Sequence, residues 1–169
     1  MAVLLIIIIA ALVGADQLMK YWVDSDFEIG ESRDFIKFGD FEVFDLTYIR
    51  NDGAVFGSMS GQRWFLIGFT SLVIIAGIFI LFRYMKHSKV LTSALVLFIA
   101  GGIGNLIDRV RLGSVIDMFE FKIFEFAIFN IADIFVVFAI ILLFIYVIFI
   151  DPKLEKQKKA VSEQESSDE

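Results

Sequence analysis

Two aspartates, Asp117 and Asp133, stand where the surrounding sequence is strongly apolar, and they are the best candidates for chemistry. Asp133 comes directly before the apolar run 134–150, which is long enough to enter a bilayer. A carboxylate at such a place costs a few kcal/mol unless it is paired or lies in a wet cavity, so it indicates a functional site. The segment between the two aspartates can fold as a loop, which predicts an acid–base pair.

Two aspartates held a few Å apart share one proton, because two adjacent negative charges repel each other. The ionised carboxylate can activate a water molecule, and the protonated one can donate to a carbonyl oxygen and then to the leaving amine. Such a pair can hydrolyse a peptide bond without a metal or a covalent intermediate. General acid–base catalysis contributes roughly 10²–10⁴-fold, so positioning and electrostatics must supply the remainder.

The composition excludes several other mechanisms. The chain has no cysteine, which removes disulfides, thiol nucleophiles and thiolate metal ligands. Its one histidine, His87, makes a histidine-rich zinc site implausible, so no metal or other cofactor is expected. A Ser–His pair fails because His87 is expected across the membrane from the aspartates, and no serine is identified near Lys20 for a Ser–Lys pair. No basic face is available for nucleic acid.

The chain is 58% hydrophobic, which is far above a soluble domain and predicts a mainly α, polytopic membrane protein. Four apolar segments approach the ~20 residues that cross a bilayer. They cover residues 2–23, 64–82, 90–107 and 131–150. We expect a four-transmembrane-helix bundle forming one domain over residues 1–152. The first segment lacks a preceding basic region, so we interpret it as a retained helix rather than a cleaved signal peptide.

Lysine and arginine in short loops predict the orientation in the membrane. The connection 83–89 carries basic but no acidic residues, and lysines begin the polar tail 153–169, which is expected to be disordered. Both segments are expected in the cytoplasm, which also places both termini there. The loops 24–63 and 108–130 are then expected outside.

The two outer loops are rich in residues that favour β-strands. Residues 41–49 lack glycine and proline, and apolar and charged residues alternate over 119–123. Both patterns predict short strands with one apolar face, in a small extracytoplasmic β-rich subdomain. That face could rest on lipid, grip an extended substrate near Phe44 and Tyr48, or merely cap the bundle, and the pattern does not decide between these.

With this topology, polar residues from every part of the chain meet near the outer membrane interface. Asp16 and Lys20 share one face of the first helix, in its outer half. The other polar residues lie at the outer ends of the segments or in the outer loops: Asn51, Asn105, Asp108, Arg109 and Asn130. This convergence indicates a site more strongly than any single residue does.

Each of these features also has a structural explanation. Asp16 and Lys20 could form a catalytic dyad, but an ion pair that fixes the first helix is the simpler interpretation. The polar residues at helix ends and turns could cap helices or satisfy backbone groups. Gly101, Gly102 and Gly104 fit close helix packing better than a ligand-binding loop.

Five sequence blocks resemble the bacterial lipoprotein signal peptidase family, also called signal peptidase II. In order they are DQLMK (16–20), RNDGAVFG (50–57), GGIGNLIDR (101–109), GSVIDMF (113–119) and FNIADIF (129–135). Any one block alone is weak evidence for the family. All five in this order, on four predicted spans, are highly specific for it. The second block departs from the family's usual N-x-G-A-A-F-G at Val55.

The resemblance implies an aspartic peptidase of the bacterial inner membrane, with Asp117 and Asp133 as its catalytic pair. Its substrate is a prolipoprotein whose future N-terminal cysteine carries diacylglycerol, and it cuts just before that cysteine. The cyclic peptide globomycin inhibits the family, and a monomer is expected. The other matching positions are expected to shape the pocket or hold the substrate: Asp16, Lys20, Asn51, Gly53, Asn105, Asp108, Arg109, Asn130 and Ala132.

Two other classes of function are open from the residues alone. A small ion or proton transporter could use the intramembrane carboxylates as carriers, and a scaffold or membrane chaperone could use them to join helices. A transporter would place its acids near the bilayer midplane, and no internal repeat supports one. The gathering of acids at one interface favours an enzyme.

Overall fold

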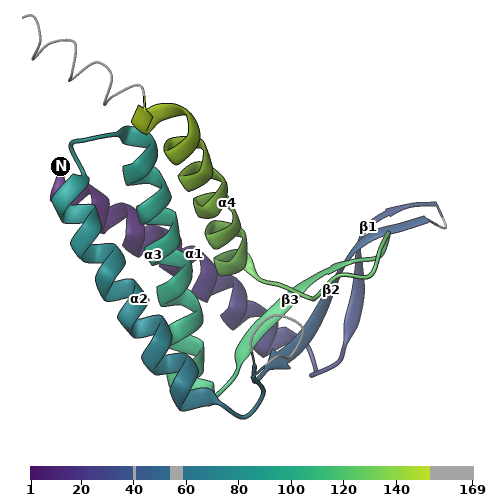
Figure 1. Ribbon diagram of the computed structural model, residues 1–169. Helices are drawn as coiled ribbons and strands as arrows, with labels where there is room; N and C mark the ends of the chain where they lie inside the picture. The colour runs from purple at the N-terminus through teal and green to yellow at the C-terminus, as the bar shows by residue number, and fades with distance from the viewer. Residues whose placement is uncertain (40, 54–58, 153–169) are drawn as a thin grey trace, which may run out of the picture.

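The computed structural model describes residues 1–39, 41–53 and 59–152, which form a helical bundle with a small sheet at one end (Figure 1). The helices are α1 (Ala2–Asp26), α2 (Arg63–Tyr84), α3 (Lys89–Leu112) and α4 (Ile131–Ile145), which continues as the π-helical turn η2 (Tyr146–Ile150). The antiparallel sheet has the order β1 (Ser32–Phe38), β2 (Phe41–Asn51) and β3 (Val115–Phe121). The predicted mainly α fold with a small β-rich part is confirmed.

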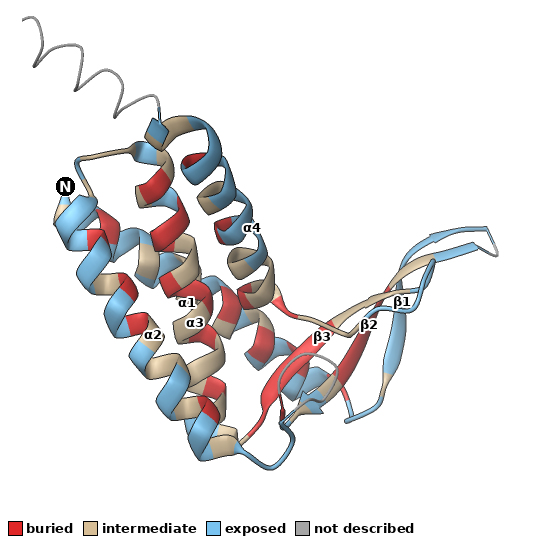
Figure 2. Cartoon of the chain, in the orientation of Figure 1, coloured by how far each residue is buried: buried red, intermediate tan, exposed pale blue. Residues whose placement is uncertain are grey.

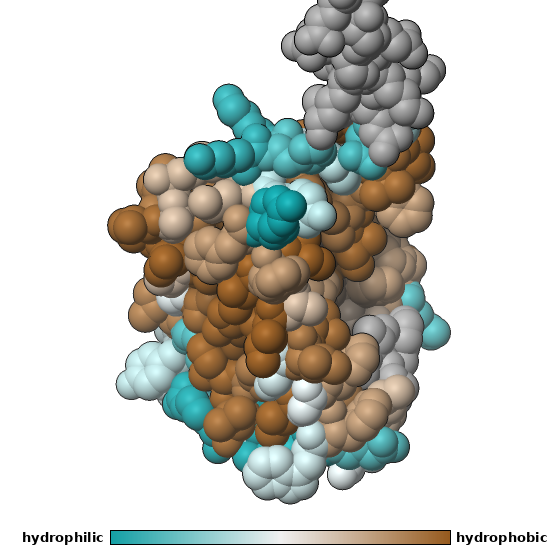
Figure 3. All heavy atoms as spheres, turned by 60° about the vertical axis from the view of Figure 1, so that its left-hand side comes forward, coloured by the Kyte–Doolittle hydropathy of each residue, from teal (hydrophilic) through white to brown (hydrophobic). Residues whose placement is uncertain are grey.

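Within the described chain, α1, α2, α3 and the α4–η2 helix are each long and apolar enough to cross a membrane. Each contains one of the four predicted spans. Buried side chains face the interior of the bundle, while apolar side chains cover its flank between hydrophilic ends (Figures 2 and 3). The chain is therefore a multi-pass membrane protein.

Local signals at helix ends explain how the chain passes from the bundle to the sheet and back. The α3 helix ends at Gly113, whose φ of 82° lies in the left-handed region that glycine adopts at little cost. The chain then turns directly into β3. The α4 helix begins with a capping box, in which the Asn130 side chain accepts from the Asp133 N–H and the Asp133 side chain accepts from the Asn130 N–H. These two ends place Asp117 and Asp133 on neighbouring segments.

Two apolar clusters hold the fold together. One lies inside the bundle, where residues such as Leu81, Leu95 and Ile99 pack between helices. The other joins the outer end of α1 to the sheet through side chains that are nearly or fully buried: Val23, Phe27, Leu46, Tyr48, Ile116 and Met118. This second cluster fixes β2 and β3 against α1, and so it sets the position of Asp117.

The α3 helix is the centre of the bundle and packs against the other three helices. Glycines make this packing possible: a Cβ on Gly101 would lie 2.4 Å from the Ala132 carbonyl oxygen, and one on Gly104 would lie 2.5 Å from Asp16 Oδ2. The prediction that these glycines serve close helix packing is therefore confirmed.

The sheet differs from the prediction in two respects. The strand expected over 119–123 begins earlier, at Val115, and ends at Phe121, because β3 follows directly from the end of α3. The strand β1 was not predicted, since all its residues are exposed and it has no buried face to leave a pattern. The substitution at Val55 and the tail 153–169 lie outside the described residues.

Candidate active site

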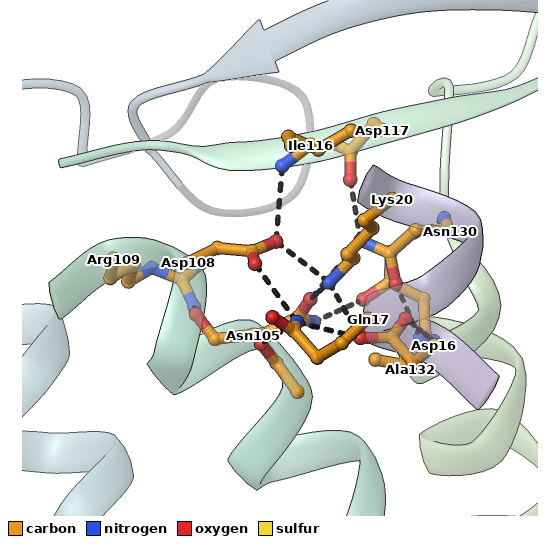
Figure 4. A network of polar contacts seen from close by, with 12 residues as sticks. Asp16, Gln17, Lys20, Asn105, Asp108, Arg109, Ile116, Asp117, Asn130 and Ala132 are labelled. Atoms are coloured by element: carbon orange, nitrogen blue, oxygen red, sulfur yellow. Dashed lines mark hydrogen bonds and ion pairs between the residues drawn. The ribbon is translucent and has the colours of Figure 1, made fainter. Parts of the chain in front are cut away.

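The polar residues predicted to converge do meet, at the end of the bundle that contacts the sheet (Figure 4). The helices supply Asp16 and Lys20 from α1, Asn105, Asp108 and Arg109 from α3, and Asn130 and Asp133 from the start of α4. The sheet supplies Asn51 from the end of β2 and Asp117 from β3, where Asp117 lies opposite Ile49. Segments far apart in the sequence thus build one polar site.

Amide groups hold all four carboxylate oxygens of the two aspartates. Asp117 Oδ1 accepts from Asn130 Nδ2 at 2.6 Å, and its Oδ2 accepts from Asn51 Nδ2 at 3.0 Å. Asp133 Oδ1 accepts from Asn105 Nδ2 at 2.8 Å, and its Oδ2 accepts from the Asn130 N–H at 3.1 Å. Asn130 therefore contacts both aspartates, and the two carboxylates are held in fixed orientations.

The two aspartates differ in their surroundings. Asp117 is 2% exposed, whereas Asp133 is only half-buried. Burial raises the pKa of Asp117 to about 7, and the nearby charge of Asp133 acts in the same direction. The hydrogen bonds from Asn51 and Asn130 lower the pKa of Asp117 and offset part of this rise. Asp117 can therefore hold a proton near neutral pH, as an acid–base pair requires.

A buried ion-pair cluster lies behind the aspartates. Lys20 is 1% exposed, and its Nζ lies 3.0 Å from Asp16 Oδ2 and 2.8 Å from Asp108 Oδ2. Asp16 Oδ1 accepts from the Ala132 N–H at 2.9 Å, and Asp108 Oδ2 accepts from the Ile116 N–H at 3.3 Å. The cluster thus joins α1, α3, α4 and β3. The structural interpretation of Asp16 with Lys20 is supported, and Asp108 does more than cap α3.

Gln17 belongs to this cluster but was not among the predicted site residues. Its Nε2 donates to Asp108 Oδ1 at 3.0 Å, to the Gly104 carbonyl at 3.2 Å and to Asp16 Oδ2 at 3.2 Å. Its side chain ties α1 to α3. The available signal was an uncharged polar residue between Asp16 and Lys20 in an otherwise apolar span.

The loop after β2 is held to α3 through Gly53. The Gly53 N–H donates to Asn51 Oδ1 at 3.0 Å, and its carbonyl accepts from Arg109 Nη2 at 3.1 Å. Arg63, at the start of α2, donates to the Arg109 and Val110 carbonyls at 2.9 and 2.8 Å. Arg109 therefore links the loop to the helix that carries Asn105.

A groove of about 780 Å³ opens beside the aspartates, between the sheet and α4. Its polar part is formed by both aspartates with Asn51, Asn105 and Arg109. The remainder is apolar and contains phenylalanines from the sheet and its following loop: Phe44, Phe121, Phe126 and Phe129. Of the two residues on the strand face that could grip substrate, Phe44 lines the groove, whereas Tyr48 is 2% exposed in the cluster against α1.

A smaller groove of about 230 Å³ lies between α2 and α4, over Gly101 and Gly102 of α3. It also reaches Asn105, Arg109 and Asp133. Asp133 therefore lines both grooves. An extended peptide in the larger groove would pass directly beside both carboxylates.

Comparison with known proteins identifies the family. The family model described as signal peptidase (SPase) II matches residues 8–149. The chain belongs to the signal peptidase II family. The resemblance predicted from the five sequence blocks is thereby confirmed, and the protein is an aspartic peptidase of the signal peptidase II type.

Curated relatives match this chain over most of their length. The lipoprotein signal peptidase of Lactococcus lactis subsp. cremoris (strain MG1363) is 40% identical over 144 residues, which cover 85% of this chain and 92% of the relative. That of Clostridioides difficile (strain 630) is 40% identical over 153 residues, covering 89% of this chain and 98% of the relative.

Two solved structures, both described as bacterial membrane enzymes, share the fold of this chain. One has a TM-score of 0.75 at 32% sequence identity and covers 85% of this chain and 86% of its own. The other has a TM-score of 0.73 at 32% identity and covers 86% and 93%. The arrangement of helices and sheet is thus the arrangement of known membrane enzymes.

Proposed function

We propose that Asp117 and Asp133 are the catalytic pair with which this peptidase removes the signal peptide from diacylglyceryl-modified prolipoproteins, cutting just before the modified cysteine. The single observation that carries the assignment is the bridge through Asn130, which contacts both carboxylates beside the large groove. The raised pKa of Asp117 supports the pairing.

In this mechanism Asp117 is the acid and Asp133 the base. Ionised Asp133 takes a proton from a water molecule, whose oxygen attacks the carbonyl carbon of the scissile peptide bond. Asp117 donates its proton to the carbonyl oxygen, giving a tetrahedral diol. The C–N bond then breaks as Asp133 passes a proton to the leaving amine, and Asp117 recovers its proton from the diol hydroxyl. Atoms and charges balance with water as the only co-reactant.

The surrounding amides make the pair suitable for this work. They hold each carboxylate in one orientation, so little reorganisation is needed when charge moves during the reaction. Arg109 also lines both grooves, and its positive charge lies close enough to act on both aspartates. It is placed to hold the substrate backbone or to stabilise developing negative charge.

The groove also suits a lipidated substrate. Its wall is largely apolar, and the aspartates lie on β3 and in the first turn of α4, the elements at the sheet end of the bundle (Figure 1). Acyl chains on the cysteine remain in one leaflet and keep the scissile bond near that membrane interface. Binding energy from the remote lipid can then orient the peptide bond at the aspartates.

The basic connection 83–89 supports an orientation with both termini in the cytoplasm and the site near the outer leaflet of the bacterial inner membrane. Both described ends of the chain lie at the end of the bundle away from the sheet (Figure 1). The enzyme acts as a monomer in this proposal, and globomycin competes with substrate for the large groove.

The test is a gel-shift assay with a purified diacylglyceryl-modified precursor. Asp117→Asn and Asp133→Asn should each abolish cleavage while the protein still folds and inserts, whereas Asp34→Asn, an exposed aspartate on β1, should cleave like wild type. Turnover at the wild-type rate by either site variant would remove that aspartate from the mechanism.

A further inference from the structure

Lys20 is a buried charge that the proposed mechanism does not use. Its three partners are Asp16, Asp108 and the Asn105 side-chain oxygen, which accepts from Nζ at 2.9 Å. None of its hydrogen bonds or ion pairs in the described residues is to Asp117 or Asp133. A buried ammonium costs several kcal/mol to desolvate, so its presence needs an explanation beyond packing.

The first clue is where the two paired carboxylates are attached. Asp16 accepts from the backbone N–H of Ala132, the residue directly before Asp133. Asp108 accepts from the backbone N–H of Ile116, the residue directly before Asp117. Lys20 thus joins two anchors, and each anchor holds the backbone next to one aspartate of the pair (Figure 4).

The second clue is the orientation of the Asn105 amide. A lysine ammonium can only donate hydrogen bonds, so Asn105 must turn its oxygen toward Lys20. The Asn105 nitrogen then points to Asp133 Oδ1, to which it donates at 2.8 Å. The Asn105 oxygen also accepts from Asn130 Nδ2 at 3.1 Å, the same nitrogen that donates to Asp117. The ammonium thus reinforces the orientation that Asp133 Oδ1 and Asn130 Nδ2 also favour, and its loss weakens the hold on Asn105.

We propose that Lys20 is a positioning residue of the catalytic pair: it fixes the separation of the two aspartates through Asp16 and Asp108, and it fixes their orientation through Asn105. The inference rests on the proposed function of Asp117 and Asp133. Lys20 touches neither the substrate nor the reacting atoms, and it acts only through these three neighbours.

A purely structural ion pair would behave differently. Its loss would lower the amount of folded enzyme but leave the kcat of each folded molecule unchanged. Loss of a positioning residue lowers kcat and leaves KM nearly unchanged, because the groove that binds substrate is intact. A misplacement of about 1 Å between reacting groups costs roughly 100-fold in rate.

The pH profile provides a second readout. Asp117 lies within reach of the charges of Asp133 on α4, Lys20 on α1 and Arg109 on α3, and Lys20 is itself paired with Asp16 and Asp108. The positive charge of Lys20 favours the ionised form of Asp117, so its removal raises the pKa of Asp117. The alkaline limb of the kcat/KM profile should therefore move to higher pH in a folded Lys20→Met variant, which lacks this charge alone.

The experiment compares steady-state cleavage by variants in detergent or lipid, normalised to folded enzyme. Lys20→Met alone leaves two buried carboxylates facing each other and can fail to fold. The triple variant Lys20→Met/Asp16→Asn/Asp108→Asn keeps an acceptor oxygen for both backbone N–H groups and leaves the cluster neutral. Lys37→Met is the matched control, because it makes the same change at a lysine that pairs with two carboxylates, Asp34 and Glu42, on the exposed hairpin.

We expect the folded Lys20 variants to lose roughly 100-fold in kcat with KM within about threefold of wild type, and Lys20→Met to show the shifted alkaline limb where it folds. Lys37→Met should keep the wild-type kcat. A folded Lys20 variant with wild-type kcat would overturn the inference, as would an equal loss in Lys37→Met. If Asp117→Asn and Asp133→Asn are inactive while the Lys20 variants are normal, only this inference fails. If those two Asn variants turn over normally, the proposed function fails instead.

Discussion

Asp117 carries the most unusual chemistry in the molecule, because burial and a neighbouring aspartate both favour its neutral form. An aspartate in water is ionised above about pH 4 and cannot serve as an acid at neutral pH. Here the pKa of about 7 keeps a proton available under ordinary conditions. The different environments of the two aspartates support the different roles that we propose for them.

The first prediction concerns the pH dependence of cleavage. If Asp117 supplies the proton, kcat/KM should fall as the pH rises through about 7, the pKa of that carboxyl, and should approach a tenfold loss per pH unit beyond it. The measurement is the cleavage rate between pH 5 and 9 with one lipidated precursor. A rate that stays level up to pH 9 would exclude Asp117 as the acid.

The second prediction separates the two tasks of Asn130, which caps α4 and also holds Asp117. Asn130→Ala removes both the cap and the hydrogen bond to Asp117. It should lower the free energy of unfolding by about 1 kcal/mol, the typical cost of a lost N-cap. Asn130→Ser keeps a capping oxygen, so it should be nearly as stable as wild type. Both variants should lose activity, since both lack the amide Nδ2 that reaches Asp117 Oδ1 at 2.6 Å.

Thermal unfolding measures the stability of the two Asn130 variants, and cleavage assays on the same preparations measure their activity. Full activity in Asn130→Ser would mean that the cap alone matters and that the bridge between the aspartates is dispensable.

Among the elements, the helices could be predicted from the sequence and the sheet only in part. Apolar runs long enough to cross a bilayer predict α2 and α4 directly, because no other structure hides that many backbone groups from lipid. The i,i+4 spacing of Asp16 and Lys20 predicts their ion pair. The second partner, Asp108, depends on how α1 packs against α3, and no local pattern records that packing.

The small strand β1 could not be predicted from the sequence, because no local pattern marks it. Its side chains are exposed throughout, so its conformation is set by pairing with β2, from Ser32 with Thr47 to Phe38 with Phe41. The position of Tyr48 could be predicted only in part. Strand alternation predicted an apolar face but not which neighbour covers it, and α1 rather than the groove covers Tyr48.

The third prediction tests the contact between α1 and α3. A Cβ on Gly104 would lie 2.5 Å from Asp16 Oδ2, so Gly104→Ala should displace Asp16 and cost roughly 1–3 kcal/mol of stability, with a loss of activity. Gly68→Ala on α2 is the matched control, because a Cβ there has no described atom within 4 Å. Thermal unfolding and cleavage are measured for both. Equal behaviour of the two variants would show that the close approach of the helices is unimportant.

At the scale of the whole molecule, the chemistry is concentrated at one end and the lipid-facing surface covers the rest. The polar site lies against the sheet, while the single histidine, His87, lies at the other end near Asp151 and Tyr146. The large groove opens between these two regions, along α4. This arrangement suits a substrate that is part peptide and part lipid.

The fourth prediction tests whether the phenylalanine wall of the groove binds substrate. Phe44 lines the groove, whereas Phe38 is 71% exposed at the end of β1 and does not. Phe44→Ala should raise KM several-fold for the lipidated precursor with little change in kcat, because it removes apolar contact rather than a reacting group. Phe38→Ala should behave like wild type. An unchanged KM in Phe44→Ala would support a sheet that only caps the bundle.

The central claim is that the two aspartates act as one unit, and a double-variant comparison of kcat/KM tests it most directly. Residues that act together in one step are strongly non-additive, so losing both costs little more than losing one. We predict that Asp117→Asn/Asp133→Asn is about as inactive as either single variant, all measured on folded enzyme with one lipidated precursor. A double variant whose loss equals the product of two separate partial losses would contradict the account.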